Sequence, residues 1–425
     1  MKQLNILVGY ILLLSICINA FTRNSELNIG FALRGHFWFL LATILYGFFV
    51  SSNFRDVFKR KLSKFISVHF FLYICYSAYL GNEYVFIKAD FAKILFLLAG
   101  ILLPNFIGYI KNKVFQNCIY LIFIFVLLSY YIYLQSFSGF HLRYSGYTTA
   151  YLHQLFIPVL FFCLTYNKIT KNSNQTLFLI LLIVFFYATF LGKSRASFLA
   201  IIIGLLFLIN LNIRNDIKLG SSFINIFKSS INFAMPIFLA ITLYLGYSNL
   251  LDSSNLRISE LGWTESGRMR GDNFRILEAA YVFQEYIKPN LFFGSGFGSH
   301  FITLNGDIET DVHLGLFSLL YKFGLISVCL FLLLLINLNI KYFIHSRSRK
   351  WLLKEPVLLL VPSLTIWLFF LIVAKGLFPE SLFGLGLTIG LYLKNKALIK
   401  STLYLQIQKA SPKVEAGTAS SITAS

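Results

Sequence analysis

Long apolar runs separated by short polar connections extend along almost the whole chain. Runs of about 18 or more apolar residues are the sequence pattern of transmembrane helices. Twelve such spans are predicted, at residues 4–21, 36–52, 65–82, 87–108, 117–135, 150–166, 176–192, 196–213, 231–248, 313–337, 356–374 and 379–394. The pattern therefore predicts an all-α polytopic membrane protein with about twelve transmembrane helices.

One long polar segment interrupts this pattern, at residues 249–312 between two apolar runs. We interpret residues 1–407 as one membrane domain that carries this segment as a large outer loop. Residues 408–425 are small and polar, with too little apolar surface to bury, which predicts a disordered tail. A membrane protein with a single large polar loop is expected to carry out its chemistry there.

The composition agrees with a membrane protein and narrows the possible partners. The 425 residues are 57% hydrophobic and only 13% charged, whereas a soluble domain has about 25% charged residues. A net charge of +20 would suit nucleic acid, but the basic residues lie in short loops between apolar runs. That placement follows the positive-inside rule, so we exclude nucleic acid as a partner and expect membrane lipids around the chain.

The same rule predicts the orientation of the chain. The loops 53–64 and 338–355 are rich in Lys and Arg and fall on the same side as both termini when there are twelve spans. This side is predicted to be cytoplasmic, which puts 249–312 on the outer side. The five cysteines have no CxxC spacing and their number is odd, so neither a zinc site nor a disulfide framework is predicted.

An amphipathic helix is predicted within the outer loop, from Asp272 to Lys288. Asp272 suits the N-cap position. One apolar stripe is expected along this helix, formed by Ile276, Ala280, Phe283 and Ile287. Arg275 falls in the first turn, where the helix dipole favours a bound anion. The alternative is an ion pair between Arg275 and Glu278 on a solvated face.

Glycines flank two further features of the outer loop. Arg268 and Arg270 lie in the stretch 266–271, where their guanidinium groups either capture phosphate oxygens or remain solvated. Residues 293–298 read Phe-Gly-Ser-Gly-Phe-Gly. No strand is expected before this stretch and no Lys-Ser/Thr pair follows it, so a tight turn is predicted rather than a phosphate cradle.

Ionisable residues also stand at the outer ends of the predicted spans. Lys193 and Arg195 lie in the turn between two spans, where they either bind substrate or extend to the membrane interface. His313 opens the span after the loop and can accept or donate a proton near neutral pH. The other outer positions, which could contact substrate or lipid headgroups, are His141, Arg143, His153, Lys375 and Glu380.

These residues form an outward-facing cationic set without a cluster of metal ligands. Several arginines suit an anionic, lipid-linked substrate, because Arg stabilises the negative charge of a departing diphosphate. A histidine within hydrogen-bonding reach can act as the base for an acceptor hydroxyl. Neither a metal nor a cofactor is predicted.

The order and spacing of these motifs resemble the O-antigen ligase and O-antigen polymerase superfamily. A Ser-Arg pair at 194–195 opens an outward helix hairpin, and the large loop follows the next hairpin. The loop contains a helix led by Arg275 and then the glycine-rich stretch 293–298. It closes with His313, eleven residues before a Gly-Leu-Ile at 324–326.

The resemblance covers about residues 150–335, and it implies a fold, an activity and a site. Its members are bacterial inner-membrane glycosyltransferases that act on undecaprenyl-diphosphate-linked glycans at the periplasmic face. The resemblance implies that Arg195 and Arg275 bind the donor diphosphate and that His313 activates the acceptor hydroxyl, without a metal. The acceptor is lipid A-core in a ligase and another lipid-linked repeat unit in a polymerase. The Ser-Arg hairpin and Lys375, followed by Gly and soon an aromatic residue, favour a ligase.

A transporter or flippase for the same lipid-linked glycan is the alternative from another functional class. Such a protein should show internal repeat symmetry and charged residues near the middle of the membrane. No repeat is visible in the sequence, and most charges are expected at the outer boundary and in the outer loop. The sequence therefore favours the transferase.

Overall fold

The computed structural model of this protein is mostly helical, with 88% of its described residues in helices. It describes residues 2–22, 30–50, 61–106, 124, 142–170, 175–186, 195–215, 272–303, 306, 308–312, 314–345, 355–373 and 379–410. The predicted all-α class is therefore confirmed for this part of the chain.

The helices follow the predicted apolar runs. Their bounds are α1 (Lys2–Thr22), α2 (Gly30–Val50), α4 (Lys61–Tyr79), α5 (Tyr84–Phe106), α7 (Leu142–Thr170), α8 (Gln175–Phe186), α9 (Arg195–Asn215), α12 (Asp272–Val282), α13 (Gly315–His345), α15 (Val361–Val373) and α16 (Pro379–Ala410). Two predicted spans, 231–248 and all but Ile124 of 117–135, lie outside the described residues. Every other predicted span overlaps a helix in its described residues.

One helix in the described part of the chain, Gly315–Ile344, is long and apolar enough to cross a membrane by its length and composition. Several shorter apolar helices accompany it, at Gln3–Ile16, Trp38–Val50, Leu152–Asn167, Ala196–Leu208 and Pro356–Ile372. The last of these includes a 3₁₀ turn, η5 (Pro356–Leu360), which leads directly into α15.

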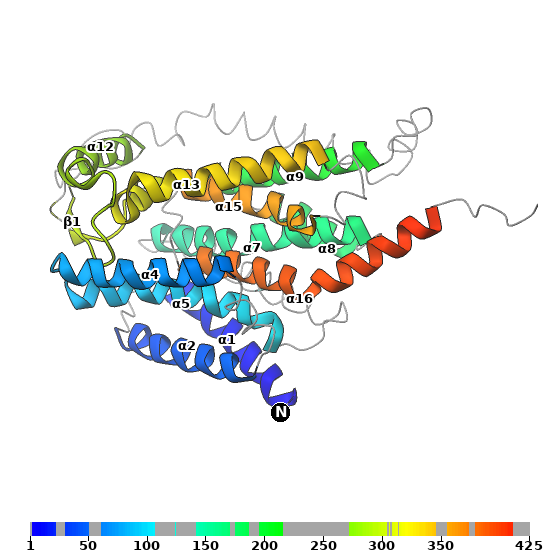
Figure 1. Ribbon diagram of the computed structural model, residues 1–425, viewed down its shortest axis with the longest axis horizontal. Coiled ribbons are helices and arrows are strands. Elements are labelled where there is room, and N and C mark those ends of the chain that lie inside the picture. Colours follow the sequence, from blue (N-terminus) through cyan, green and yellow to red (C-terminus); the bar gives the residue numbers. More distant parts are fainter. Residues whose placement is uncertain are drawn as a thin grey trace, which may run out of the picture.

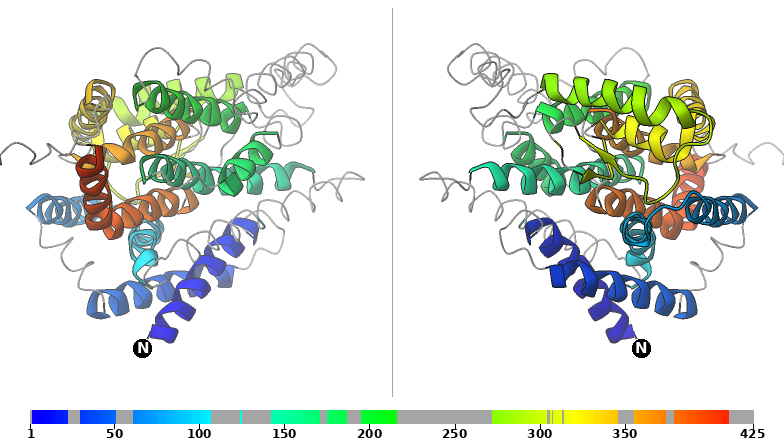
Figure 2. Two further views of the ribbon diagram at one scale, coloured as in Figure 1. Left: turned by 90° about the vertical axis from the view of Figure 1, so that its right-hand side faces the viewer. Right: turned by 90° about the vertical axis from the view of Figure 1, so that its left-hand side faces the viewer.

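The helices of the main body lie side by side along the long axis of the molecule (Figure 1). α12 and the short strand β1 lie together at one end of this body, next to the end of α4 (Figure 1). Figure 2 shows α1 and α2 crossing one another along one edge, where both also contact α5.

Small residues allow α5 and α16 to pack closely with their chains running in the same direction. A Cβ added at Gly386 would lie 2.1 Å from the carbonyl oxygen of Leu97, and one added at Gly390 would lie 2.4 Å from that of Ile101. Helix backbones approach this closely only where glycine or another small residue stands between them. The first turns of α5 and α16 therefore lie towards the same end of the molecule.

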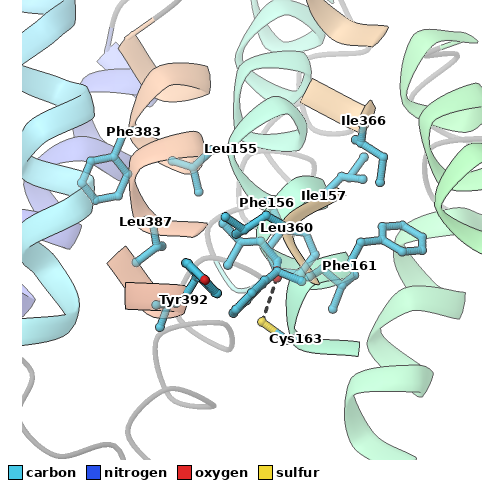
Figure 3. Packing of buried hydrophobic residues seen from close by; sticks show 14 of the residues in the cluster. Leu155, Phe156, Ile157, Phe161, Cys163, Leu360, Ile366, Phe383, Leu387 and Tyr392 are labelled. Atoms are coloured by element: carbon cyan, nitrogen blue, oxygen red, sulfur yellow. Dashed lines mark hydrogen bonds between the residues drawn. The ribbon is translucent and has the colours of Figure 1, made fainter. Parts of the chain in front are cut away.

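The apolar core surrounds α7 and continues into α15 and α16. Figure 3 shows Leu155 and Phe156 of α7 beside Phe383 and Leu387 of α16, all of them almost fully buried. Gly384 of α16 faces the backbone of Leu155, where an added Cβ would lie 2.6 Å from its carbonyl oxygen. This packing places the middle of α7 beside the early turns of α16.

Some predicted boundaries, and one local element, differ from the structure. The helix expected to end at 337 continues to His345 as α13. Residues 408–410, expected to belong to the tail, are part of α16, which extends to Ala410, and the rest of the predicted tail lies outside the described residues. A two-stranded antiparallel hairpin, β1 (Phe301–Ile302) with β2 (Ile308–Glu309), interrupts the otherwise helical chain. With so few residues per strand, no alternating pattern could identify it.

The amphipathic helix of the outer loop also differs from its prediction. Its described part begins at Asp272 as expected, but the α-helix ends at Val282. A π-helical turn, η3 (Phe283–Ile287), and a 3₁₀ turn, η4 (Lys288–Asn290), continue it. A π turn contains more residues than an α turn, so it shifts the apolar face by one position.

The buried side chains of α12 differ from the predicted stripe. Ala280 is exposed, although it was expected in the apolar stripe, whereas Ala279 and Val282 are buried. Glu278 is fully buried, so it does not lie on the solvated face that the alternative interpretation required. The next buried residue after Val282 is Ile287, five positions later, which is the spacing of a π turn.

Candidate functional site

The glycine-rich stretch 293–298 packs against a break in α13. Gly324 has a φ of 73° inside α13, which interrupts the helical hydrogen bonds around it. The carbonyl oxygens of Tyr321 and Lys322 accept instead from the N–H groups of Ser295 and Gly296, at 2.7 and 3.0 Å. The helix thus replaces bonds lost at its break by bonds to residues 295–296.

The helix residues after the break, in turn, donate hydrogen bonds to loop residues just before the glycines. The N–H of Leu325 donates to the carbonyl oxygen of Leu291 at 2.7 Å, and Ile326 donates to Phe292 at 3.4 Å. The two segments approach so closely that each needs a glycine. A Cβ added at Gly324 would lie 2.3 Å from the Phe292 oxygen, and one at Gly294 would lie 2.6 Å from the Gly324 nitrogen.

The remaining N–H groups of this stretch point at the α4–α5 hairpin. The N–H of Phe297 donates to Ser77 Oγ at 2.6 Å, and that of Gly298 donates to Asp90 Oδ2 at 2.8 Å. The N–H of Gly294 is bonded to Asn290 within the turn itself. All the N–H groups from 294 to 298 are therefore engaged within the protein, which confirms the predicted tight turn over a phosphate cradle.

Side chains of the α4–α5 hairpin fasten this turn from the other side. The Asn82 side-chain amide donates to the carbonyl oxygens of Ser295 and Phe297, both at 2.9 Å. The Tyr73 hydroxyl lies 2.7 Å from the carbonyl oxygens of Phe293 and Phe323. The glycine turn is thus held between the connecting end of the α4–α5 hairpin and the start of α13.

Four charged side chains meet directly beneath the turn. Lys93 Nζ lies 2.9 Å from Asp90 Oδ1 and 2.5 Å from Asp311 Oδ2. Lys322 contacts Asp90 Oδ2 and lies 3.9 Å from Asp311 Oδ1. Asp90 and Lys322 are each only 2% exposed. Buried charges of this kind are stable only when they are paired, and here two cations face two anions.

The closing part of the loop packs against the start of α13 through an aromatic cluster. Tyr286, Phe301 and Tyr321 contact one another, with ring centroids 5.8–6.3 Å apart. Val312 is fully buried in the same cluster, and its carbonyl oxygen accepts from Ser318 Oγ at 3.1 Å. The residues before and after position 313 are therefore tied to α13.

A second polar contact joins the interior of α7 to the first turn of α9. His153 Nδ1 lies 2.9 Å from Ser197 Oγ, and both residues are buried. Ser197 lies two residues after Arg195, the first residue of α9. This contact connects two regions that the sequence suggested separately, the patch containing His153 and the turn containing Arg195.

The structure describes only part of the predicted site. Arg195 and Arg275 occupy the first turns of α9 and α12, and Arg143 lies in α7, with their side chains outside the described part. Glu380 lies in the first turn of α16 and is fully buried. The other predicted site residues lie outside the described residues: Lys193, Arg268, Arg270, His141, Lys375 and His313.

Sequence reasoning missed three members of the charge cluster. Asp90, Lys93 and Lys322 stand inside the predicted spans 87–108 and 313–337, although most charges were expected at the boundary and in the loop. An ionisable residue within an apolar span is by itself a signal of function or pairing. Asp90 and Lys93 also have the i, i+3 spacing that places two side chains on one helix face.

No family model, no curated protein and no solved structure matches this chain. Among the side chains that the structure describes, no group of three or more His, Cys, Asp or Glu residues comes together as a metal site would require.

Proposed function

We propose that this chain is a glycosyltransferase of the bacterial inner membrane. It would transfer a glycan from undecaprenyl diphosphate to a hydroxyl of lipid A-core at the periplasmic face, as an O-antigen ligase does. The observation that carries the proposal is the joining of α12, the glycine turn and the start of α13 at one end of the helical body. These are the elements that bear Arg275 and adjoin His313.

Each proposed role follows from the chemistry of the side chain. Arg195 and Arg275 would bind the donor diphosphate and stabilise its charge as the bond to the sugar breaks. His313 would accept the proton of the acceptor hydroxyl while its oxygen forms the new bond to the sugar carbon. Arg268, Arg270, Lys193, His141, Arg143 and Lys375 are the proposed further contacts to donor and acceptor.

The proposal includes the membrane arrangement. About twelve transmembrane helices would hold both termini in the cytoplasm and present the loop 249–312 to the periplasm. The contact between His153 and Ser197 supports a site that includes both α7 and α9, because it ties α7 to the first turn of α9, which begins at Arg195.

A polymerase that joins lipid-linked repeat units is the closest alternative, since it differs only in the acceptor. A transporter of the same lipid-linked glycan has one observation in its favour. Asp90, Lys93 and Lys322 are charged residues inside apolar helices, as transport pathways require. They are paired near the beginnings of their helices, however, beside the glycine turn.

Reconstitution in proteoliposomes tests the proposal. Purified protein is given undecaprenyl-diphosphate-linked glycan with either lipid A-core or a second lipid-linked repeat unit as acceptor. We expect a glycosidic product with lipid A-core, and a loss of turnover greater than the loss of donor binding in His313→Ala. A product with the lipid-linked acceptor alone would identify a polymerase. Movement of the donor across the bilayer without any product would overturn the enzyme proposal in favour of a transporter.

A further inference from the structure

We infer that Asp90, Lys93, Asp311 and Lys322 form an ionic clasp that fixes the closing segment of the outer loop, residues 308–312, against α5 and α13. Through this clasp Lys93 and Asp311 would act as positioning residues for His313, which follows Asp311 by two positions. The role toward His313 rests on the proposed function, whereas the clasp itself does not.

The ammonium group of Lys93 is the direct link between the helical body and the loop. It lies 2.9 Å from Asp90 Oδ1 on its own helix and 2.5 Å from Asp311 Oδ2 on the loop. Lys322 adds a second link, since it contacts Asp90 and lies 3.9 Å from Asp311 Oδ1. Asp90 also accepts the N–H of Gly298, so one carboxylate joins α5, α13 and the glycine turn.

Burial explains why this cluster can hold the loop. Asp90 and Lys322 are 2% exposed, and Lys93 and Asp311 are 14% and 17% exposed. Each charge in such surroundings depends on its partners, because an unpaired buried charge is costly. If Asp311 moved away, the clasp would keep two buried cations and a single anion. The segment 308–312 is therefore favoured in its docked position.

The chain connection to Asp311 limits how far His313 can lie from the clasp. Two residues of extended chain span at most about 7 Å, so the backbone of His313 stays near Asp311 in any conformation. Val312 between them is buried, and Ser318 donates to its carbonyl oxygen at 3.1 Å. A base that must lie within hydrogen-bonding reach of a hydroxyl depends on this kind of anchoring.

Hydrogen–deuterium exchange tests the clasp without any substrate. In Lys93→Met we expect faster exchange in peptides covering 308–312 than in the wild type, and Lys93→Arg should restore slow exchange. Lys88→Met is the matched control on the same helix, because Lys88 lies over the Trp38 ring, 5.7 Å from its centroid, and takes no part in the clasp. Unchanged exchange of 308–312 in Lys93→Met would overturn the clasp.

Asp311→Asn provides a second route if Lys93→Met does not fold. Its side chain lies at the more exposed side of the cluster, so the change is milder, and the same faster exchange of 308–312 is expected. The double variant Lys93→Met with Asp311→Asn should exchange little faster than either single variant, because both remove the same contact. Additive effects would show that the two residues act separately.

Transfer kinetics test the positioning role. Lys93→Met should lower kcat by about tenfold to a hundredfold, the loss that a small misplacement of a reacting group produces, with KM for the donor unchanged. Lys93→Arg should recover most of kcat. A raised KM with unchanged kcat would overturn positioning in favour of direct substrate contact. If the wild type forms no product, the proposed function fails, while the exchange measurement still decides on the clasp.

Discussion

At the scale of single residues, the charged pairs beneath the glycine turn differ greatly in their surroundings from the other ion pairs of the described chain. Lys322 and Asp90 are buried to within 2% of their side-chain surface, whereas Lys341 and Glu355 are 40% and 38% exposed at 3.6 Å. Water screens the exposed pair, so this pair contributes little to the stability of the protein. Removal of one partner from the buried pair leaves the other charge buried and uncompensated.

This difference predicts that replacing Lys by Met has unequal effects at two positions of α13. Lys322→Met should lower the free energy of unfolding by about 3–5 kcal/mol, because the buried carboxylate of Asp90 loses one of its two cationic partners. Lys341→Met should change it by about 1 kcal/mol or less. Thermal unfolding of the two purified variants in detergent measures both. Equal shifts of Tm in the two variants would contradict the larger contribution of the buried pair to stability.

Single residues also show where sequence reasoning succeeded and failed. The glycine-rich stretch was correctly predicted as a tight turn, because its neighbours lacked the strand and the Lys-Ser/Thr pair of a phosphate cradle. The pairing of Asp90 with Lys322 could not be predicted, since 232 positions separate them in the chain. Local spacing predicts contacts within one helix, but it contains no information on which distant helix lies opposite.

At the scale of elements, the break in α13 and the glycine turn form one interlocked unit. Gly324 and Gly294 face each other so closely that a Cβ on either would meet the backbone of the other. The hydrogen bonds that the helix loses at its break pass to residues 291–296 of the loop. The loop and the helix therefore cannot reach their final shapes independently.

The interlock predicts a specific cost for one alanine. Gly324→Ala should destabilise the protein by more than the about 1–2 kcal/mol that left-handed backbone costs an L-residue, because its Cβ would lie 2.3 Å from the Phe292 oxygen. Gly81→Ala is the matched control, since Gly81 has a φ of +76° with nothing within 4 Å of an added Cβ. Similar losses in unfolding free energy for the two variants would contradict the interlock.

The outer-loop helix shows the limit of periodic patterns at this scale. Its start at Asp272 and its helical character were predicted, but the apolar spacing assumed one α-helix as far as Lys288. The π turn at Phe283–Ile287 offsets the buried face of α12 from that of the residues after it, so Ala280 and Ile287 do not share one stripe. The packing of Tyr286 against Phe301 and Tyr321 accompanies this turn, and such tertiary contacts are not visible in a periodic pattern.

At the scale of the whole molecule, several helix beginnings gather at the end that carries the loop. α5 and α16 run in the same direction, and Leu155 of α7 lies against Gly384 near the start of α16. His153, well inside α7, contacts Ser197 in the first turn of α9 at this level. The hydropathy pattern predicted these helices, since apolar runs depend on local sequence alone. The contacts that join them come from residues far apart in the chain.

The arrangement predicts which residues face outward in the cell. In a cysteine-free background, Lys288→Cys should react with a membrane-impermeant maleimide in intact spheroplasts, because η4 lies at the loop end. Lys341→Cys, near the opposite end of α13, should react only after permeabilisation. Labelling of Lys341→Cys in intact spheroplasts, with Lys288→Cys protected, would reverse the proposed orientation.

The proposed activity depends most directly on the cation at the first turn of α12. Glycan transfer from undecaprenyl diphosphate should be abolished in Arg275→Ala while membrane insertion stays intact, because this arginine is proposed to bind the diphosphate. Lys288→Ala is the matched control, since it removes the same charge from an exposed position of the same loop. The decisive measurement is the rate of product formation by the wild type and these two variants in proteoliposomes. The account predicts product from the wild type and Lys288→Ala but none from Arg275→Ala, and near-wild-type transfer by Arg275→Ala would contradict it.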